Sequence, residues 1–159
     1  MHTALEGIFE ELGFDARRVQ LPEGAAMYAL ARTYHLVMRR MASVYKRFGL
    51  SAASFNLLVL LQRGRDASSL TQQAAGERLV VSPSDMTGLV DRLERRGLVR
   101  RVPGKDRRSN LLRVTPAGCR LVEDVWPHHA QEMKRLAGRL SAQDTQALAR
   151  IVSRLRQAA

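Results

Sequence analysis

The sequence predicts a mainly helical domain of the α+β class with one small sheet, and three observations support this. The chain has 159 residues, which is the length of one ordinary domain. Apolar residues make up 45% and charged residues 26%, as in globular rather than disordered chains. Apolar residues recur at helical spacing over most of the sequence, whereas only two short segments after Gly97 have strand character. We therefore expect a single domain over residues 1–159.

Two amphipathic helices are expected at the N-terminal end. A short helix fits Thr3–Phe14, and Pro22 and Gly24 end that pattern. A long helix from about Glu23 to Phe48 carries a heptad-like stripe: Met27, Leu30, Tyr34, Val37, Met41, Val44 and Phe48. A second stripe, which consists of Ala31, Met38 and Tyr45, widens the apolar face, so this helix is expected to pack on two sides.

Three shorter helices follow, each preceded by a residue that can cap it. Ser51 precedes a helix over Ala53–Arg63, and Thr71 precedes one over Gln72–Leu79. Ser82 precedes a helix that begins at Pro83 and ends at Gly97.

The helix that begins at Pro83 has two distinct faces. Asp85 stands three residues after Ser82, at capping-box spacing, so its carboxylate is expected to turn back onto the cap. Four apolar residues form the buried stripe: Met86, Leu89, Val90 and Leu93. The opposite face is small near the start of the helix and basic near its end, and consists of Ser84, Asp85, Thr87, Gly88, Asp91, Arg92 and Arg95.

Two short strands and two helices complete the chain. The strands are expected at Leu98–Val102 and Leu111–Thr115, and the charged, turn-forming segment between them makes a basic hairpin. A long helix then runs from Pro116 through Leu140, with a kink expected at Pro127. Ser141 caps a last helix whose apolar stripe is Leu148, Ile151, Val152 and Leu155.

The charge distribution favours a polyanionic partner. The formal net charge is +11, and residues 1–25 do not contribute to this excess, because they hold five acids and two bases. Nine bases lie between Arg92 and Arg113, against only Glu94 and Asp106. Nucleic acid is the first candidate for the partner, and an anionic membrane surface is the second.

Several classes of function have little support. Cys119 is the only cysteine, so an intramolecular disulfide and a cysteine-rich zinc module are excluded, and a reducing cytoplasm fits best. We expect a buried small side chain at Cys119 rather than a redox switch. His128 and His129 are adjacent and point about 100° apart on a helix, which does not suit a metal. We find no signal peptide, membrane span or catalytic motif, and expect no enzyme and no cofactor.

The order of elements is that of a winged helix-turn-helix, a DNA-reading unit. The segments Thr71–Val99, Asp106–Ser109 and Leu111–Gly118 resemble the MarR family of bacterial transcriptional regulators, with similarity from about Ser51 to Trp126. The resemblance implies a DNA-binding lobe over residues 50–115 and a helical dimerisation lobe over 1–49 and 116–159. The sequence departs from the family pattern at Val80, where a glycine is usual, and at Pro83, where a basic or polar residue is usual.

A DNA-reading helix reaches base edges with its first turns, which here present Ser84, Thr87 and Gly88. Thr71 and Gln72 open another helix and can direct backbone N–H groups at a phosphate, while Arg92, Arg95 and Arg101 suit the DNA backbone. By resemblance, Arg108 enters the minor groove and Asp106 holds its guanidinium. The complete predicted DNA-binding set is Thr71, Gln72, Ser82, Ser84, Thr87, Gly88, Arg92, Arg95, Arg101, Lys105, Asp106, Arg107 and Arg108.

Two functions from different classes remain open. The first is a homodimeric, cytoplasmic repressor that binds a pseudo-palindromic operator and is released by a small aromatic or phenolic effector. The second is a winged-helix interaction module whose basic face binds acidic protein or anionic membrane. An effector cavity could be lined by Tyr28, Tyr34, His35, Met38, Phe55 and Trp126, although core packing accounts for each of these residues as well.

Overall fold

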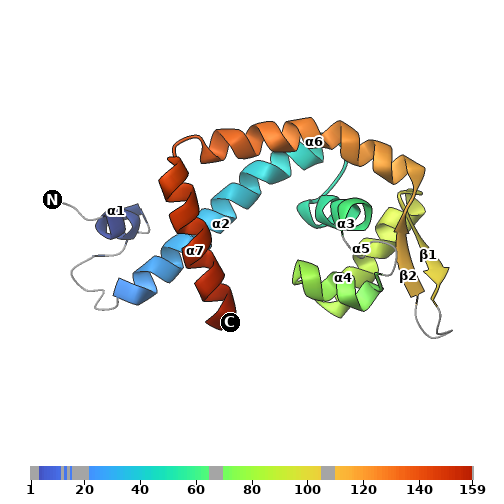
Figure 1. Ribbon diagram of the computed structural model, residues 1–159, viewed down its shortest axis with the longest axis horizontal. Coiled ribbons are helices and arrows are strands. Elements are labelled where there is room, and N and C mark those ends of the chain that lie inside the picture. Colours follow the sequence, from blue (N-terminus) through green and yellow to red (C-terminus); the bar gives the residue numbers. More distant parts are fainter. Residues whose placement is uncertain are drawn as a thin grey trace. The chain divides into compact units, whose positions relative to one another are not determined.

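The computed structural model describes residues 4–11, 13, 15, 22–64, 70–104 and 110–158. It divides into two compact units, Met1–Arg40 and Met41–Ala159. The described segments form seven helices and one two-stranded antiparallel sheet (Figure 1). The predicted mainly helical α+β class is therefore confirmed.

The first unit contains α1 (Ala4–Glu11) and most of α2 (Pro22–Lys46). The helix α2 begins at Pro22, one residue earlier than predicted, because the fixed φ of proline suits the first helical position. It ends at Lys46, two residues before the predicted end at Phe48. Along α2, Met27, Leu30 and Tyr34 of the predicted stripe are exposed in the single chain.

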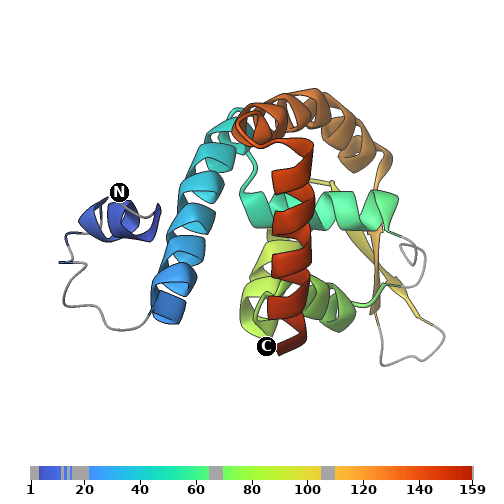
Figure 2. The same cartoon turned by 60° about the vertical axis from the view of Figure 1, so that its left-hand side comes forward.

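The core of the second unit surrounds α3 (Ala52–Arg63). Figures 1 and 2 show α3 between α6 (Pro116–Ala137) on one side and α4 (Gln72–Leu79) and α5 (Pro83–Arg95) on the other. The sequence predicts a core for this helix of Phe55, Leu58, Val59 and Leu61. Of these, Phe55, Leu58 and Leu61 are buried and Val59 is half-buried, and Leu57, which the periodicity missed, is buried as well. Because neighbours cover α3 on opposite sides, more than one stripe of its surface is buried.

The sheet consists of β1 (Val99–Pro103) and β2 (Asn110–Val114), with Val99 opposite Val114. Each strand is displaced by one residue from its predicted bounds. The residue Thr71 forms an isolated bridge with Leu111, and the Leu112 N–H donates to the Leu70 carbonyl at 2.8 Å. The chain just before α4 is therefore tied to β2, which fixes the start of α4 relative to the hairpin.

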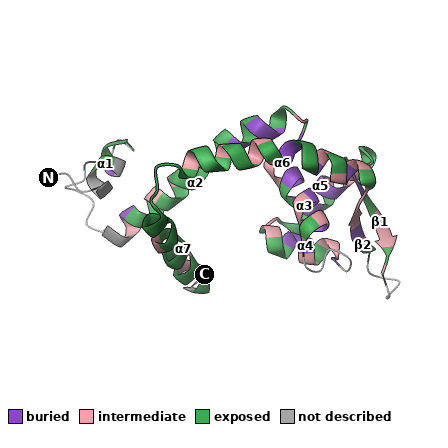
Figure 3. Ribbon diagram, turned by 45° about the horizontal axis from the view of Figure 1, so that its top comes forward, coloured by how far each residue is buried: buried purple, intermediate pink, exposed green. Residues whose placement is uncertain are grey.

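The C-terminal helices are α6 and α7 (Ala142–Ala158). The helix α6 contains Pro127 and continues beyond it to Ala137. Near its start, a Cβ at Gly118 would lie 2.3 Å from the Leu98 carbonyl oxygen, so only glycine fits this contact with the turn before β1. Buried residues gather in α3, α5 and the adjoining part of α6, whereas α7 is largely exposed (Figure 3).

Candidate nucleic-acid interface

A tight turn joins α4 to α5, with Val80 at the end of α4 and Ser82 at the start of α5. Val80 ends α4 in the left-handed conformation, with φ 53° and ψ 49°, which a β-branched side chain rarely adopts. Its side chain is 93% exposed, so no packing compensates for this conformation. Among the described residues it is the only residue other than glycine with positive φ. The departure from glycine noted at this position is thus a point of local strain.

Ser82 caps α5 in the predicted way. Its hydroxyl accepts from the Asp85 N–H at 3.2 Å and donates to the Asp85 carboxylate at 2.6 Å. Pro83 occupies the first turn, where a missing N–H carries no cost. The carboxylate of Asp85 therefore turns back onto the cap as expected, which draws its charge away from the exposed face of the helix.

The predicted two faces of α5 are confirmed. Met86, Leu89, Val90 and Leu93 are each no more than 1% exposed, and they join α5 to the core. On the opposite face Ser84, Thr87, Arg92 and Arg95 are exposed, and Gly88 is half-buried. Within the part of the chain that the structure describes, no hydrogen bond or ion pair holds the guanidinium groups of Arg92 and Arg95. The helix presents small side chains first and cationic ones further along, which suits base edges followed by phosphates.

Thr87 is held in one orientation by two hydrogen bonds. Its hydroxyl donates to the Pro83 carbonyl at 3.0 Å, and it accepts from the Gln72 side-chain amide at 2.7 Å. The single hydroxyl proton is therefore used within the protein, and the γ-methyl group is the part of Thr87 with no polar role. The side chain of Gln72, predicted to act only through its backbone N–H, contributes to the same surface.

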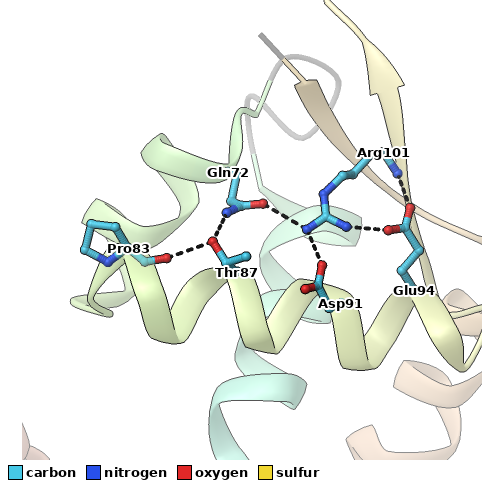
Figure 4. A network of polar contacts seen from close by, with 6 residues as sticks. All are labelled: Gln72, Pro83, Thr87, Asp91, Glu94 and Arg101. Carbon is cyan, nitrogen blue, oxygen red and sulfur yellow. Dashed lines mark hydrogen bonds and ion pairs between the residues drawn. The ribbon is translucent and has the colours of Figure 1, made fainter.

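A polar network links β1 to α4 and α5 (Figure 4). The guanidinium of Arg101 forms ion pairs with Asp91, at 2.6 Å, and with Glu94, and it donates to the side-chain carbonyl oxygen of Gln72 at 3.2 Å. The backbone N–H of Arg101 also donates to the Glu94 carboxylate at 3.0 Å. Partial burial alone would lower the pKa of Arg101, but the hydrogen bonds and charges of Asp91 and Glu94 outweigh it and raise the pKa above its ordinary value.

These contacts give Arg101 a different setting from the free phosphate contact that the sequence predicts. The prediction rested on its charge and its place beside the hairpin, and sequence spacing gave no sign that two α5 carboxylates would face it. Arg96 is also engaged within the protein, because it donates to the Gly49 carbonyl at 2.6 Å near the end of α2. Only part of the basic cluster between Arg92 and Arg113 is therefore presented to a partner.

The remaining predicted residues divide into those that the structure places and those that it does not describe. Thr71 caps α4, where its hydroxyl accepts from the Ala74 N–H at 3.1 Å. The predicted hairpin-tip contacts lie outside the described residues: Lys105, Asp106, Arg107 and Arg108. Their roles remain predictions.

A hollow of about 660 Å3 opens between α4 and the start of α5. Its wall includes Gln72, Val80, Pro83 and Thr87. The hollow therefore adjoins the exposed face of α5, which we call the reading face and which consists of Ser84, Thr87, Gly88, Arg92 and Arg95. No sequence pattern indicates this hollow, because its shape depends on how α4 and α5 pack.

The predicted effector-binding residues fall in different units. Tyr34, His35 and Met38 belong to the first unit, and Phe55 and Trp126 belong to the second. A shared cavity for these residues therefore remains a prediction. In the second unit Phe55 and Trp126 both pack on His129, with ring centroids 5.1 and 5.3 Å away.

The residue His129 belongs to an aromatic cluster that the sequence did not reveal. Its Nδ1 lies 3.0 Å from the Tyr45 hydroxyl, and Tyr45 stacks on Phe55. Burial lowers the pKa of His129 and raises the pKa of Tyr45, so at neutral pH the phenol can donate to an uncharged imidazole. In the described part of the chain no cluster of three potential metal-ligating side chains occurs.

Two further predictions concern Cys119 and the membrane. Cys119 is a free thiol in the first turn of α6 and is half-buried rather than fully buried as expected. Across the residues that the structure describes, no helix has the length and apolar character needed to span a membrane.

The two helices, their reading face and the paired strands define a winged helix-turn-helix, which is a DNA-binding unit. Comparison with known proteins identifies the family. The MarR family profile matches residues 48–109. The uncharacterized regulator YkoM of Bacillus subtilis is 32% identical over 112 residues, which cover 70% of this chain and 71% of YkoM.

Two solved structures agree with this result. The MarR family regulator Sco5413 of Streptomyces coelicolor has 30% identity and a TM-score of 0.74, with 87% of this chain and 95% of Sco5413 covered. PcaV of Streptomyces coelicolor, solved in complex with its natural ligand, has 25% identity and a TM-score of 0.68, with 88% and 96% covered. The chain belongs to the MarR family of winged-helix, DNA-binding transcriptional regulators, which are not enzymes.

Proposed function

We propose that this regulator is a homodimeric repressor that binds a pseudo-palindromic operator and releases it when a small aromatic or phenolic compound binds. The observation that carries the proposal is the reading face of α5, where small side chains precede two exposed arginines beside a paired hairpin. A regulator must reach the chromosome, so the proposal includes a cytoplasmic location.

The proposed reading of DNA divides the contacts by type. Ser84, Thr87 and Gly88 approach base edges in the major groove, while Arg92 and Arg95 bind phosphates. At the hairpin tip, Arg108 enters the minor groove, and Asp106 holds its guanidinium.

The proposed dimer is supported by apolar side chains that the single chain leaves exposed. Tyr34 on α2 is 59% exposed, and Leu148 and Ile151 on α7 are 46% and 55% exposed. Apolar groups of this size on terminal helices are typical of a self-complementary interface. A dimer would separate two α5 helices by about 34 Å, one turn of DNA. Light scattering at micromolar concentration should give twice the chain mass of 17.8 kDa, and a monomer that still binds operator would contradict the dimer.

The proposed effector site uses Met38 and the aromatic residues Tyr34 and Trp126. Support comes from the structure of PcaV, a relative solved with its natural ligand. Effector and operator must then weaken each other by the same factor. Calorimetry with salicylate or benzoate as probes, with and without operator, should show this reciprocity. Equal affinity in both conditions would exclude the tested compound as an effector.

Two binding measurements separate the proposed function from the alternative of a basic interaction surface. Fluorescence anisotropy measures binding to a duplex enriched from a random pool and to a scrambled duplex. Cosedimentation measures binding to anionic phosphatidylserine vesicles. We expect the enriched duplex to bind at least about 10³-fold more tightly than the scrambled one. Equal binding to both duplexes, or binding to vesicles alone, would contradict sequence-specific regulation.

A further inference from the structure

The guanidinium of Arg101 joins β1 to the start of α4 and to the C-terminal half of α5. It contacts Gln72 on α4 and Asp91 and Glu94 on α5, and its side chain is only 23% exposed. The two carboxylates and one guanidinium together carry one negative charge, so this cluster offers no surplus positive charge to a phosphate. A DNA phosphate that approached Arg101 would also approach Asp91 and Glu94.

The network assigns one orientation to the Gln72 amide. Arginine has only donors, so the atom of Gln72 that faces Arg101 at 3.2 Å is the carbonyl oxygen. The amide nitrogen then donates to the Thr87 oxygen, whose own proton goes to the Pro83 carbonyl. Each donor meets an acceptor in a single direction (Figure 4). A flipped amide would place its NH2 group against the guanidinium and its oxygen against an oxygen whose proton is already used.

This orientation limits what Gln72 and Thr87 can offer to a base. Among the described residues, no hydrogen bond uses the second N–H of the Gln72 side-chain amide, and the γ-methyl group of Thr87 has no polar role. Adenine readout by glutamine needs a carbonyl oxygen and an N–H turned together toward the base, but here the contact with Arg101 holds the side-chain oxygen of Gln72 toward β1. Thymine carries both a C5-methyl group and an O4 acceptor in the major groove, so it matches both free groups.

We propose that Arg101 is a positioning residue that fixes the Gln72 amide and thereby gives the Gln72–Thr87 pair a preference for thymine at one position of each half-site. This rests on the proposed function, in which α5 lies in the major groove. Without Arg101 the amide can rotate and pair with adenine, so the preference for thymine falls.

The test compares Arg101→Met with Arg100→Met, a control that removes the exposed arginine next to it on β1. The probe is a duplex enriched from a random pool by the unmodified protein, with all four bases placed in turn at each half-site position. Anisotropy at several salt concentrations then gives base preference and salt slope separately. We expect Arg101→Met to reduce the discrimination for thymine at one position by about five- to tenfold, while the log–log salt slope stays unchanged.

A direct phosphate contact gives the opposite pattern. Arg101→Met would then weaken all sequences equally and lower the salt slope by about one unit. Arg101→Lys separates the two roles further, because a lysine retains the charge but lacks the planar fork that serves both carboxylates and the amide. We expect Arg101→Lys to lose thymine preference like Arg101→Met, and full retention of the preference in either variant would overturn the proposal.

Gln72→Met provides a second route if the Arg101 variants fail to fold. It leaves the pairs of Arg101 with Asp91 and Glu94 in place and removes only the amide, so we expect the same position to lose its preference. An unchanged preference would overturn the proposal. If the unmodified protein enriches no sequence at all, the proposed function fails together with this inference. If it enriches an operator and the variants keep its base preference, only the role of Arg101 fails.

Discussion

A methyl group added at Gly88 should stabilise the protein and weaken its binding to DNA. Gly88 lies inside α5, where glycine is about 1 kcal/mol less favourable than alanine. Outside the helix backbone and among the described residues, a Cβ there would meet only the Arg92 Nη1 atom, at 3.3 Å. That atom ends a flexible side chain and can move by a few tenths of an ångström. The packing of the chain therefore gives no reason for glycine at this position.

We expect Gly88→Ala to raise the free energy of unfolding by about 0.5–1 kcal/mol and the midpoint of thermal unfolding by about 1–4 °C. If α5 approaches base edges closely at this position, the same methyl group should weaken operator binding by about tenfold or more, which is about 1.4 kcal/mol. Calorimetry measures the first effect, and anisotropy with the enriched duplex at fixed salt measures the second.

Displacement of Arg92 is the competing explanation for weaker binding. A double-mutant cycle with Arg92→Ala resolves it, because a methyl group that acts only through Arg92 would have no further effect once Arg92 is removed. We expect Gly88→Ala to weaken binding in both backgrounds. A stabilised Gly88→Ala protein with unchanged operator affinity would refute the close approach of α5 to DNA at Gly88.

Three other predictions follow from the geometry. Val80→Gly should stabilise the protein by about 1 kcal/mol, because glycine adopts the left-handed conformation at position 80 without the strain of an exposed β-branched side chain. An unchanged or lower midpoint of thermal unfolding would contradict the claim that Val80 is strained. Arg95→Ala should lower the log–log salt slope of binding by about one unit on operator and random duplex alike, and an unchanged slope would exclude a phosphate contact. Burial lowers the pKa of His129 in the folded protein, so as the pH falls His129 is protonated in the unfolded chain before it is protonated in the folded one. The free energy of unfolding should therefore fall as the pH drops below 6.5 and level off once the pH is below the pKa of His129 in the folded protein. Thermal unfolding from about pH 7.5 to about pH 5 should show a smaller loss in His129→Gln than in the matched control His128→Gln, and equal losses would refute this assignment.

Local signals in the sequence predicted the helix starts well. The predicted capping residues Ser51, Thr71 and Ser82 each accept a hydrogen bond from the backbone N–H three residues further along the chain. Capping depends on short-range geometry that sequence spacing records directly. The predicted ends of helices and bounds of the strands were less accurate, because tertiary hydrogen bonds such as that from the Leu112 N–H to the Leu70 carbonyl help to determine where a strand begins and ends.

Contacts between residues far apart in the chain could not be predicted from the sequence. Arg101 was predicted as a free cation, since nothing in its neighbourhood indicates that Gln72 lies 3.2 Å from its guanidinium. The pairing of Tyr45 with His129 joins residues 84 positions apart, so no local pattern could reveal it. Charge and helical periodicity predicted which face of α5 is exposed and basic, but they could not predict which arginines form ion pairs within the protein.

Selection from a random pool of duplexes is the most direct test of sequence-specific DNA recognition by this protein. The unmodified protein and Arg92→Ala are each incubated with the pool at physiological salt, and bound sequences are read after several rounds. We expect the unmodified protein to enrich one pseudo-palindrome with half-sites about 10 bp apart, and Arg92→Ala to recover it less efficiently. Recovery of unrelated sequences by the unmodified protein, with no shared half-site, would contradict sequence-specific recognition by α5.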